Sequence, residues 1–263
     1  MSERVTITED GPVAIVTLSR PEKRNALDLE MIEAIVAAGV SLAKRKDIRA
    51  VVLTGAGEAF CAGLDVAAMP LLAKAAKDVG FAKRTHNRSN LFQATAMVWT
   101  ELPQPVIAAI NGYAFGGGFQ IMLGADMRIA APDARFSIME GRWGLIPDMG
   151  GMVLMRRLAR GDVIRRLTYT AEQFAAADAQ AWGFVTELAK DPVARAKDLA
   201  QQIALKSPDA VRAAKQLITD TELTDIESTL ILESVVQEGL VGTPNQMEAI
   251  MAGLQKRDPV FKD

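Results

Sequence analysis

Apolar and polar residues alternate at the start of the chain and give way to longer apolar runs further on. Residues 5–19, VTITEDGPVAIVTLS, alternate around Asp10-Gly11-Pro12, which is typical of a β-hairpin. Residues 48–55, IRAVVLTG, form a continuous apolar run that ends in glycine, as a buried parallel strand does. PVIAAINGYA at 105–114 and MRIAAP at 127–132 have the same character. The pattern therefore predicts one hairpin and three buried strands.

Helical periodicity separates these strands. Asp28 can cap a helix whose apolar stripe recurs at helical spacing, at Met31, Ile35, Ala38 and Leu42. Residues 74–101 indicate a long helical stretch with a polar face, and a short apolar helix follows the glycines at 116–118. Strands separated by helices imply right-handed crossovers, so we expect an α/β core.

From about residue 171 onward the pattern is mostly helical. An amphipathic helix near the end carries an apolar stripe at Met247, Ile250, Met251 and Leu254. Together with the stripe of residues 223–240, this face packs either on the core or on another subunit. We therefore divide the chain into a core at 1–200 and a helical region at 201–263.

Composition limits the function classes. The 263 residues are 49% hydrophobic with a net charge of −2, so no general basic field favours nucleic acid. The single cysteine, Cys61, excludes an internal disulfide, argues against a cysteine-based metal cluster, and fits a small buried apolar residue. No run approaches the ~20 apolar residues that span a bilayer and no signal-peptide pattern opens the chain, so we expect a cytoplasmic protein. The single histidine, His86, is expected to be a surface residue on a polar helix.

Two glycine-bearing loops carry the candidate chemistry. NGYAFGGGFQIMLGAD at 111–126 places Gly116, Gly117 and Gly118 between a strand and a helix, where backbone N–H groups can be aimed at an anion. It matches neither GxGxxG nor GxxxxGK[ST], so a nucleotide-phosphate loop is poorly supported. GAGEAFCAGLDV at 55–66 also follows an apolar strand. One N–H group from each loop could therefore bind one oxygen.

The pair FCAGLD and NGYAFGGG resembles the crotonase (enoyl-CoA hydratase/isomerase) superfamily. The resemblance continues, in order, through PEKRNALD, DARFSIMEGRWGLIPDMGG and QKRDPVFKD, and so covers nearly the whole chain. It implies an α/β fold in which ββα turns form a spiral core, followed by a helical C-terminal trimerisation region. It also implies an acyl-CoA substrate and a homotrimer or a dimer of trimers.

The resemblance assigns an oxyanion hole to the two loops. The matching N–H groups belong to Leu64 and Gly117, and they would hold the carbonyl oxygen of a CoA thioester. Losing one such donor typically costs about 2.7–4 kcal/mol of transition-state stabilisation. A side chain at the glycine triplet would block the approach of the thioester.

Three residues are candidates for catalysis. Hydratases of this superfamily use two glutamates, and this chain has Gln120 at the first position and Glu140 at the second. An amide does not exchange protons near neutral pH, which puts two-glutamate hydration in doubt. Asp148 matches a loop in which some isomerases and a dehalogenase-type branch carry a catalytic aspartate, and it could equally cap a helix.

These residues favour double-bond isomerisation slightly over hydration. Three alternatives stay open: a hydratase in which Asp148 and Gln120 hold the water beside Glu140, a thioester hydrolase or dehalogenase with Asp148 as nucleophile, and a non-catalytic CoA-binding scaffold. The absence of GxSxG makes a serine hydrolase improbable. We expect no metal and no cofactor beyond the CoA of the substrate.

The resemblance also assigns residues to the carrier and to the acyl group. The expected CoA contacts are Arg24, backbone groups of Ala26, Ala62 and Asp65, and, from a neighbouring subunit, Lys256, Phe261 and Lys262. Asp65 is also a candidate helix cap. The acyl pocket should be apolar, with Met69, Leu72, Phe92 and Trp143 as its expected lining.

Overall fold

A six-stranded sheet forms the centre of the molecule. The computed structural model describes residues 4–263, apart from the side chains of residues 73, 76 and 79. Its strands are β1 (Val5–Asp10), β2 (Val13–Leu18), β3 (Ala50–Gly55), β4 (Val106–Ile110), β6 (Met127–Ala130) and β9 (Glu187–Leu188), in the order β1-β2-β3-β4-β6-β9. β1 and β2 pair antiparallel and the remaining neighbours pair parallel. The hairpin and the three buried strands are confirmed.

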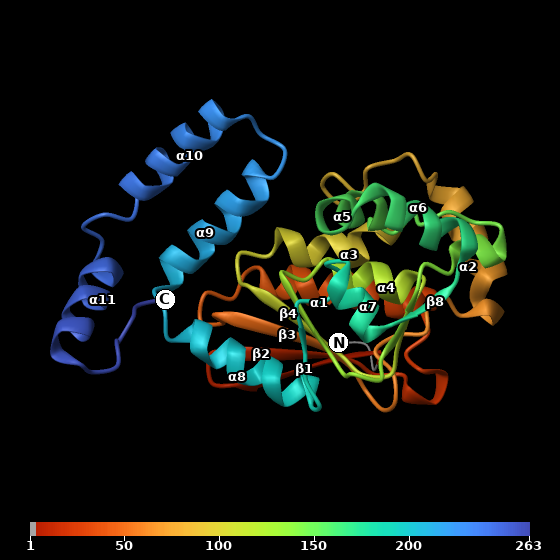
Figure 1. Ribbon diagram of the computed structural model, residues 1–263, viewed down its shortest axis with the longest axis horizontal. Helices are drawn as coiled ribbons and strands as arrows, with labels where there is room; N and C mark the ends of the chain where they lie inside the picture. Colours follow the sequence, from red (N-terminus) through yellow and green to blue (C-terminus); the bar gives the residue numbers. More distant parts are fainter. Residues whose placement is uncertain (1–3) are drawn as a thin grey trace.

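Both faces of this sheet are covered, which explains the continuous apolar runs. In β3, Val51 and Leu53 belong to one apolar cluster, whereas Ala50 and Val52 belong to another on the opposite face. Helices α1 (Leu29–Leu42), α3 (Leu91–Glu101) and α4 (Gly117–Leu123) cover the first face, and α8 (Pro192–Ala204) covers the second (Figure 1). Alternate side chains of one strand are therefore buried on opposite sides.

A second, three-stranded sheet extends the spiral beyond the glycine loops. It contains β5 (Tyr113–Phe115), β7 (Arg135–Ser137) and β8 (Gln173–Ala175), in that order. The remaining core helices are α2 (Met69–Val79), α5 (Gly151–Leu158), α6 (Gly161–Thr170) and α7 (Ala176–Ala181), with short 3₁₀ helices at Pro21–Lys23, Val66–Ala68 and Glu140–Trp143. This arrangement confirms the α/β prediction.

The N-terminal helix agrees with its sequence pattern, whereas the segment at 74–101 does not. The Asp28 side chain accepts a hydrogen bond from Met31 N, and the predicted stripe of α1 is buried. Residues 74–101, predicted as one helical stretch, instead form the end of α2, a connection and α3. Gly80 has φ +84°, and Asn90 starts α3 with a capping box, so two local signals interrupt the helix. The predicted polar face is also absent from α3, in which every residue except Glu101 is buried or half-buried.

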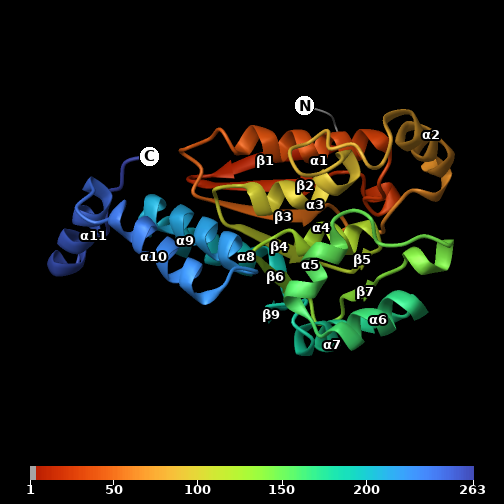
Figure 2. The ribbon, with the colours of Figure 1, turned by 90° about the horizontal axis from the view of Figure 1, so that it is seen from above.

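Three C-terminal helices leave the core as an arm. They are α9 (Pro208–Thr221), α10 (Ile226–Glu238) and α11 (Pro244–Gln255), and both views show them beyond one end of the sheet (Figures 1 and 2). Lys215 joins α9 to the core because its buried ammonium group contacts Asp126 at 2.9 Å and donates to the carbonyl oxygens of Trp99 and Gln104. The stripe predicted at 247–254 is exposed within the single chain. Across residues 4–263, no helix has the length and apolar character needed to cross a membrane.

Candidate active site

Main-chain pairing joins the two glycine-bearing loops. Cys61 lies opposite Ala114 in a short parallel bridge, in which Cys61 N donates to Tyr113 O and Phe115 N donates to Cys61 O. Three residues beyond this pair, one loop reaches Leu64 and the other reaches Gly117. The register of the bridge therefore brings these two residues to the same place.

The N–H groups of Leu64 and Gly117 are adjacent and unused. A Cβ atom built on Gly63 would lie 3.7 Å from Gly117 N, so the two loops touch here. Leu27 pairs with Gly63 O and Asp65 N, which leaves Leu64 N directed away from Leu27. Within the part of the chain that the structure describes, neither N–H group donates to a protein acceptor. Both residues line a small cavity of about 90 Å³ that Glu140 also lines.

Two positions of the triplet require glycine for different structural reasons. Gly116 adopts φ +49°, a left-handed conformation that side chains disfavour. A Cβ on Gly118 would lie 2.4 Å from Cys61 O, which is far too close for a carbon atom. The triplet thus lets the chain turn and lets α4 begin against the neighbouring loop.

Gln120 holds Glu140 in one orientation. The Gln120 Oε1 atom accepts hydrogen bonds from Met149 N and Gly151 N, both at 2.9 Å, and its Nε2 donates to Glu140 Oε1 at 2.5 Å. The two main-chain donors fix which end of the amide is oxygen. Glu140 is 7% exposed, and its second oxygen, Oε2, is buried without a hydrogen-bond partner in the protein. A substrate that bonded to this oxygen would therefore displace no hydrogen bond of the protein.

The surroundings raise the pKa of Glu140. Burial is the largest cause because it disfavours the charged carboxylate, and the nearby Asp148 carboxylate raises the pKa further. The hydrogen bond from Gln120 opposes these effects. A raised pKa brings a carboxyl group closer to neutral pH, where it can both accept and return a proton.

Asp148 faces a cavity and does not cap a helix. Helix α5 begins after Gly150, which provides no side-chain cap, and the first N–H group of α5 is bound by Gln120 instead. The capping alternative for Asp148 was therefore wrong. The carboxyl group is accessible through the cavity, yet the apolar side chains around it remove enough water to raise its pKa.

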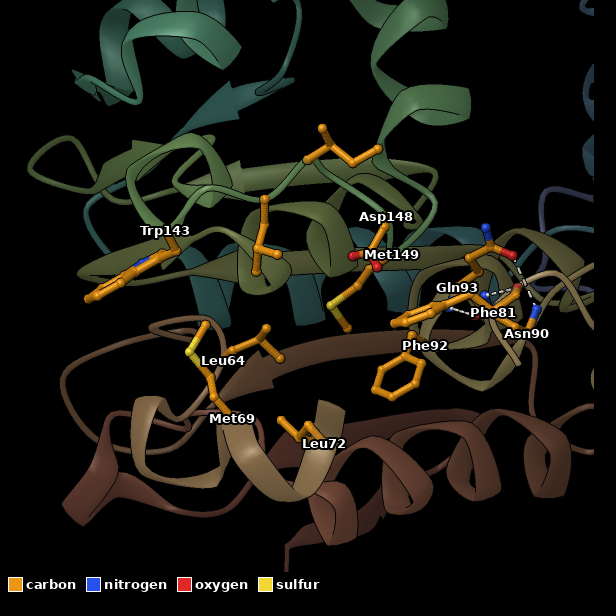
Figure 3. A pocket seen from close by; sticks show the side chains of 12 residues that line it. Leu64, Met69, Leu72, Phe81, Asn90, Phe92, Gln93, Trp143, Asp148 and Met149 are labelled. Carbon is orange, nitrogen blue, oxygen red and sulfur yellow. Dashed lines mark hydrogen bonds between the residues drawn. The ribbon is translucent and has the colours of Figure 1, made fainter. Parts of the chain in front are cut away.

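The larger cavity has a volume of about 660 Å³, and Leu64 lies in its wall (Figure 3). It shares part of its wall with the small cavity, at Leu64, Met69, Trp143 and Leu145. All four side chains predicted for the acyl pocket, Met69, Leu72, Phe92 and Trp143, line it. An apolar space therefore adjoins the two amides.

Four of the residues predicted to contact CoA gather beside this site. Ala62 N donates to Arg24 O, and Asp65 N donates to Leu27 O. The Asp65 carboxylate pairs with Arg20 at 2.8 Å and accepts from Ala67 N, which confirms its predicted capping role. Ala26 also belongs to this group, because its carbonyl oxygen accepts from Arg20. Arg24 is exposed, with its guanidinium 6.0 Å from the ring centre of Tyr113.

The three C-terminal residues lie elsewhere in the chain. Phe261 is buried with its ring 6.0 Å from the Arg49 guanidinium, and both main-chain groups of Lys262 bind the Asn245 side chain. Lys256 is exposed where α11 ends. These residues are at the end of the sheet opposite α2 (Figure 1), so a single chain does not bring them to the cavity.

Two further predictions concern residues outside the cavities. Cys61 is fully buried, and burial raises the pKa of its thiol to about 12, which confirms the apolar role. His86 was wrongly placed on a helix, since it lies in the turn at 86–89, where its ring contacts Thr85.

Sequence reasoning missed the side chain that fixes the loop positions. Asn25, within PEKRNALD, is completely buried, and its amide donates to the carbonyl oxygens of Ala56, Ala59 and Phe60. Its side-chain oxygen accepts from Arg20 N. A buried amide with four partners binds the first glycine-bearing loop to the N-terminal motif.

The spiral of ββα turns and the paired loops define an α/β protein of the crotonase type. Residues 8–263 match the family model described as enoyl-CoA hydratase/isomerase, and the chain belongs to this family, whose members act on CoA thioesters. A carnitinyl-CoA dehydratase of Salmonella enteritidis is 32% identical over 269 residues, covering 100% of this chain and 99% of the relative. The enoyl-CoA hydratase structure from Bacillus anthracis has a TM-score of 0.89 at 30% identity, covering 98% of this chain and 99% of that one. The hydratase from Polaromonas sp. JS666 has a TM-score of 0.88 at 29% identity, with the same coverage.

The electrostatics of the site can be tested by titration. In protein with labelled glutamate carboxyl carbons, NMR should place the Glu140 pKa above the ordinary glutamate range, with the signal assigned by its loss in Glu140→Gln. Asp148→Asn should lower that pKa because it removes a like charge. Asp133→Asn, at an exposed turn, should leave it unchanged. A Glu140 pKa in the ordinary range, or one that does not change in Asp148→Asn, would contradict the electrostatic coupling of the two carboxyl groups.

Proposed function

We propose that the enzyme converts an acyl-CoA thioester to its enolate and that Leu64 N and Gly117 N bind the carbonyl oxygen. Support comes from two adjacent N–H groups without protein acceptors, both facing a cavity that contains a buried carboxylate. Fixed donors stabilise the oxygen charge as it develops, and no reorganisation is needed when the proton leaves.

Glu140 is the base in this proposal. Its Oε2 atom has no protein partner, while Oε1 is held by Gln120. The oxygen that meets the substrate is thus separate from the oxygen that is anchored. A carboxyl group with a raised pKa can remove a proton next to the thioester and return it afterwards.

We propose double-bond isomerisation as the preferred reaction, with Asp148 as a second carboxylate. The observation that carries this preference is the full use of Gln120 Oε1 by Met149 N and Gly151 N. That oxygen cannot also accept a hydrogen bond from an attacking water. Isomerisation needs no water, since Glu140 can take the proton from one carbon and either Glu140 or Asp148 can deliver a proton to another.

Hydration, or the reverse dehydration, is the second candidate. It is favoured by the 32% identical relatives named as carnitinyl-CoA dehydratases and by the similar structures named as enoyl-CoA hydratases. In this candidate Asp148 would hold the water, assisted only by the second N–H of the Gln120 amide. No cofactor beyond the CoA of the substrate enters either reaction.

We propose that the carrier is bound by Arg24 and by the main chain at Ala26 and Ala62, and that a homotrimer or a dimer of trimers completes the site. The exposed apolar side chains of α10 and α11 support assembly, since large apolar surfaces are rarely left in water. Lys256 and Lys262, which are exposed, would then reach CoA from a neighbouring subunit, and Phe261, packed against Arg49, would hold this segment in place.

Isotope exchange tests the enolate. In deuterated water, enoyl-CoA or acyl-CoA incubated with the enzyme should acquire deuterium next to the thioester, measured by mass spectrometry. Glu140→Gln should reduce the exchange rate about 10²–10⁴-fold, because a general base contributes on that order. Glu101→Gln, on the exposed end of α3, is the matched control and should exchange at the wild-type rate.

The same experiment separates the rivals. Attack by Asp148 would release free acid and leave the acyl-CoA without deuterium, and a non-catalytic scaffold would give neither product. Exchange that survives in Glu140→Gln would refute the assignment of the base.

Gln120→Glu tests why this chain departs from the two-glutamate pattern. One oxygen of the new carboxylate can still accept from Met149 N and Gly151 N, while the other lies beside Glu140. We expect an increased rate of hydroxyacyl-CoA formation from enoyl-CoA, since a second proton-exchanging group then lies beside the base. Gln180→Glu, on the exposed side of α7, should not increase it. A folded Gln120→Glu enzyme without increased hydration would contradict this explanation.

A further inference from the structure

The space available to the acyl group continues beyond the carbonyl site. The small cavity at the two amides and the 660 Å³ cavity share Leu64, Met69, Trp143 and Leu145. A thioester whose oxygen binds Leu64 N therefore directs its acyl chain along this shared wall. At about 30 Å³ for each water-sized group, the larger cavity holds on the order of twenty non-hydrogen atoms. A four-carbon acyl group would leave most of it unfilled.

Two polar side chains of the lining, Asn90 and Gln93, already form hydrogen bonds at the start of α3. Asn90 Oδ1 accepts from Gln93 N, and Gln93 Oε1 accepts from Asn90 N in the capping box of α3. Asn90 Nδ2 donates to Phe81 O, and Arg84 donates to Gln93 Oε1. These groups are used to form the helix end, so this part of the wall is best matched by hydrocarbon.

Two charged groups affect how a cationic acyl group would fit the cavity. Asp148 is the single charged residue in the described lining, and its carboxylate would attract a cation. The ring of Trp143, the strongest aromatic partner for a cation, already has the Arg142 guanidinium 5.8 Å from its centre. A second cation at this ring would be repelled by the first.

Two phenylalanines line the cavity on the side away from Trp143 (Figure 3). The rings of Phe81 and Phe92 are 5.7 Å apart and tilted by 33°. Both also line a separate cavity of about 130 Å³. The pair therefore separates the acyl cavity from additional space that an acyl chain could enter.

We propose that the enzyme acts on large hydrocarbon acyl groups and that the Phe81–Phe92 pair sets the upper limit of their length. This inference rests on the proposed function, because the carbonyl position fixes where the acyl chain starts. Straight chains and ring-containing acyl groups share the required chemistry, and both are included in the test.

The first experiment measures kcat/KM with crotonyl-, hexenoyl-, octenoyl-, decenoyl-, dodecenoyl- and tetradecenoyl-CoA, and with a cyclohexenyl and a trimethylammonium acyl-CoA. We expect kcat/KM to rise about four-fold for each added methylene, the factor that corresponds to burying one methylene, until the cavity is filled. A preference for crotonyl-CoA or for the trimethylammonium substrate would overturn the proposal. If kcat/KM is highest with the cyclohexenyl acyl-CoA, the substrates are ring-containing acyl-CoAs. If it is highest with a straight chain, they are fatty acyl-CoAs.

The second experiment changes the end wall. Phe81→Ala should open the 130 Å³ cavity to the acyl chain. At about 30 Å³ per group, the acyl length with the highest kcat/KM should then increase by about four methylenes. Phe81→Trp should decrease that length. Tyr169→Ala removes an exposed aromatic ring from α6, outside the described cavity linings, and should leave it unchanged. If both Phe81 variants prefer the same acyl length as the wild-type enzyme, the proposed role of the pair is overturned.

Binding keeps this inference separate from the proposed function. Calorimetry with saturated acyl-CoAs should show affinity rising with length even where no proton is exchanged. If affinity rises with acyl length but no deuterium is exchanged, the enolate chemistry alone is rejected. If deuterium exchange occurs but affinity does not depend on acyl length, the acyl-group proposal alone is rejected.

Discussion

The pairing of two loops by main-chain hydrogen bonds is the constraint on which the site depends. Cys61 and Ala114 face each other in one short bridge, and the residues three positions later are Leu64 and Gly117. Because a shift of one residue in this bridge would separate their N–H groups, the buried Asn25 amide and the close contact of Gly118 with Cys61 O matter as much as the amides themselves. In the proposed function the thioester oxygen is thus bound by backbone atoms, and the side chains around them hold the register.

The amide of Gln120 gives this site its particular character. Its oxygen is bound by two N–H groups of the segment that also carries Asp148, and its nitrogen is bound to Glu140. A glutamate at this position would face a second carboxylate in a buried site, where like charges raise one another's pKa. Glutamine removes that repulsion and leaves Glu140 anchored through one oxygen while the other has no protein partner, which fits the proposed transfer of a proton from one carbon to another.

The sequence predicted those features that depend on local pattern. The hairpin, the buried strands and the Asp28 cap follow from alternation, apolar runs and capping chemistry within a few residues. The four apolar residues around the cavity followed from the family resemblance. What could not be predicted depends on contacts between distant segments: Gln120 with Met149 N, Asn25 with Phe60 O, and the pairing of Phe81 with Phe92. The single helix predicted at 74–101 was wrong because the backbone turns at Gly80, which has φ +84°, and a new helix begins after Asn90.

The central claim is that two amides bind a thioester oxygen, and infrared difference spectroscopy of the bound carbonyl tests it most directly. Glu140→Gln, which should bind substrate without removing its proton, would be mixed with acyl-CoA labelled at the thioester carbon. We expect the carbonyl stretch to move to lower frequency than in water, because two fixed N–H donors polarise the bond more strongly than solvent does. A bound carbonyl that absorbs at the frequency of the free thioester, or at a higher one, would contradict the claim.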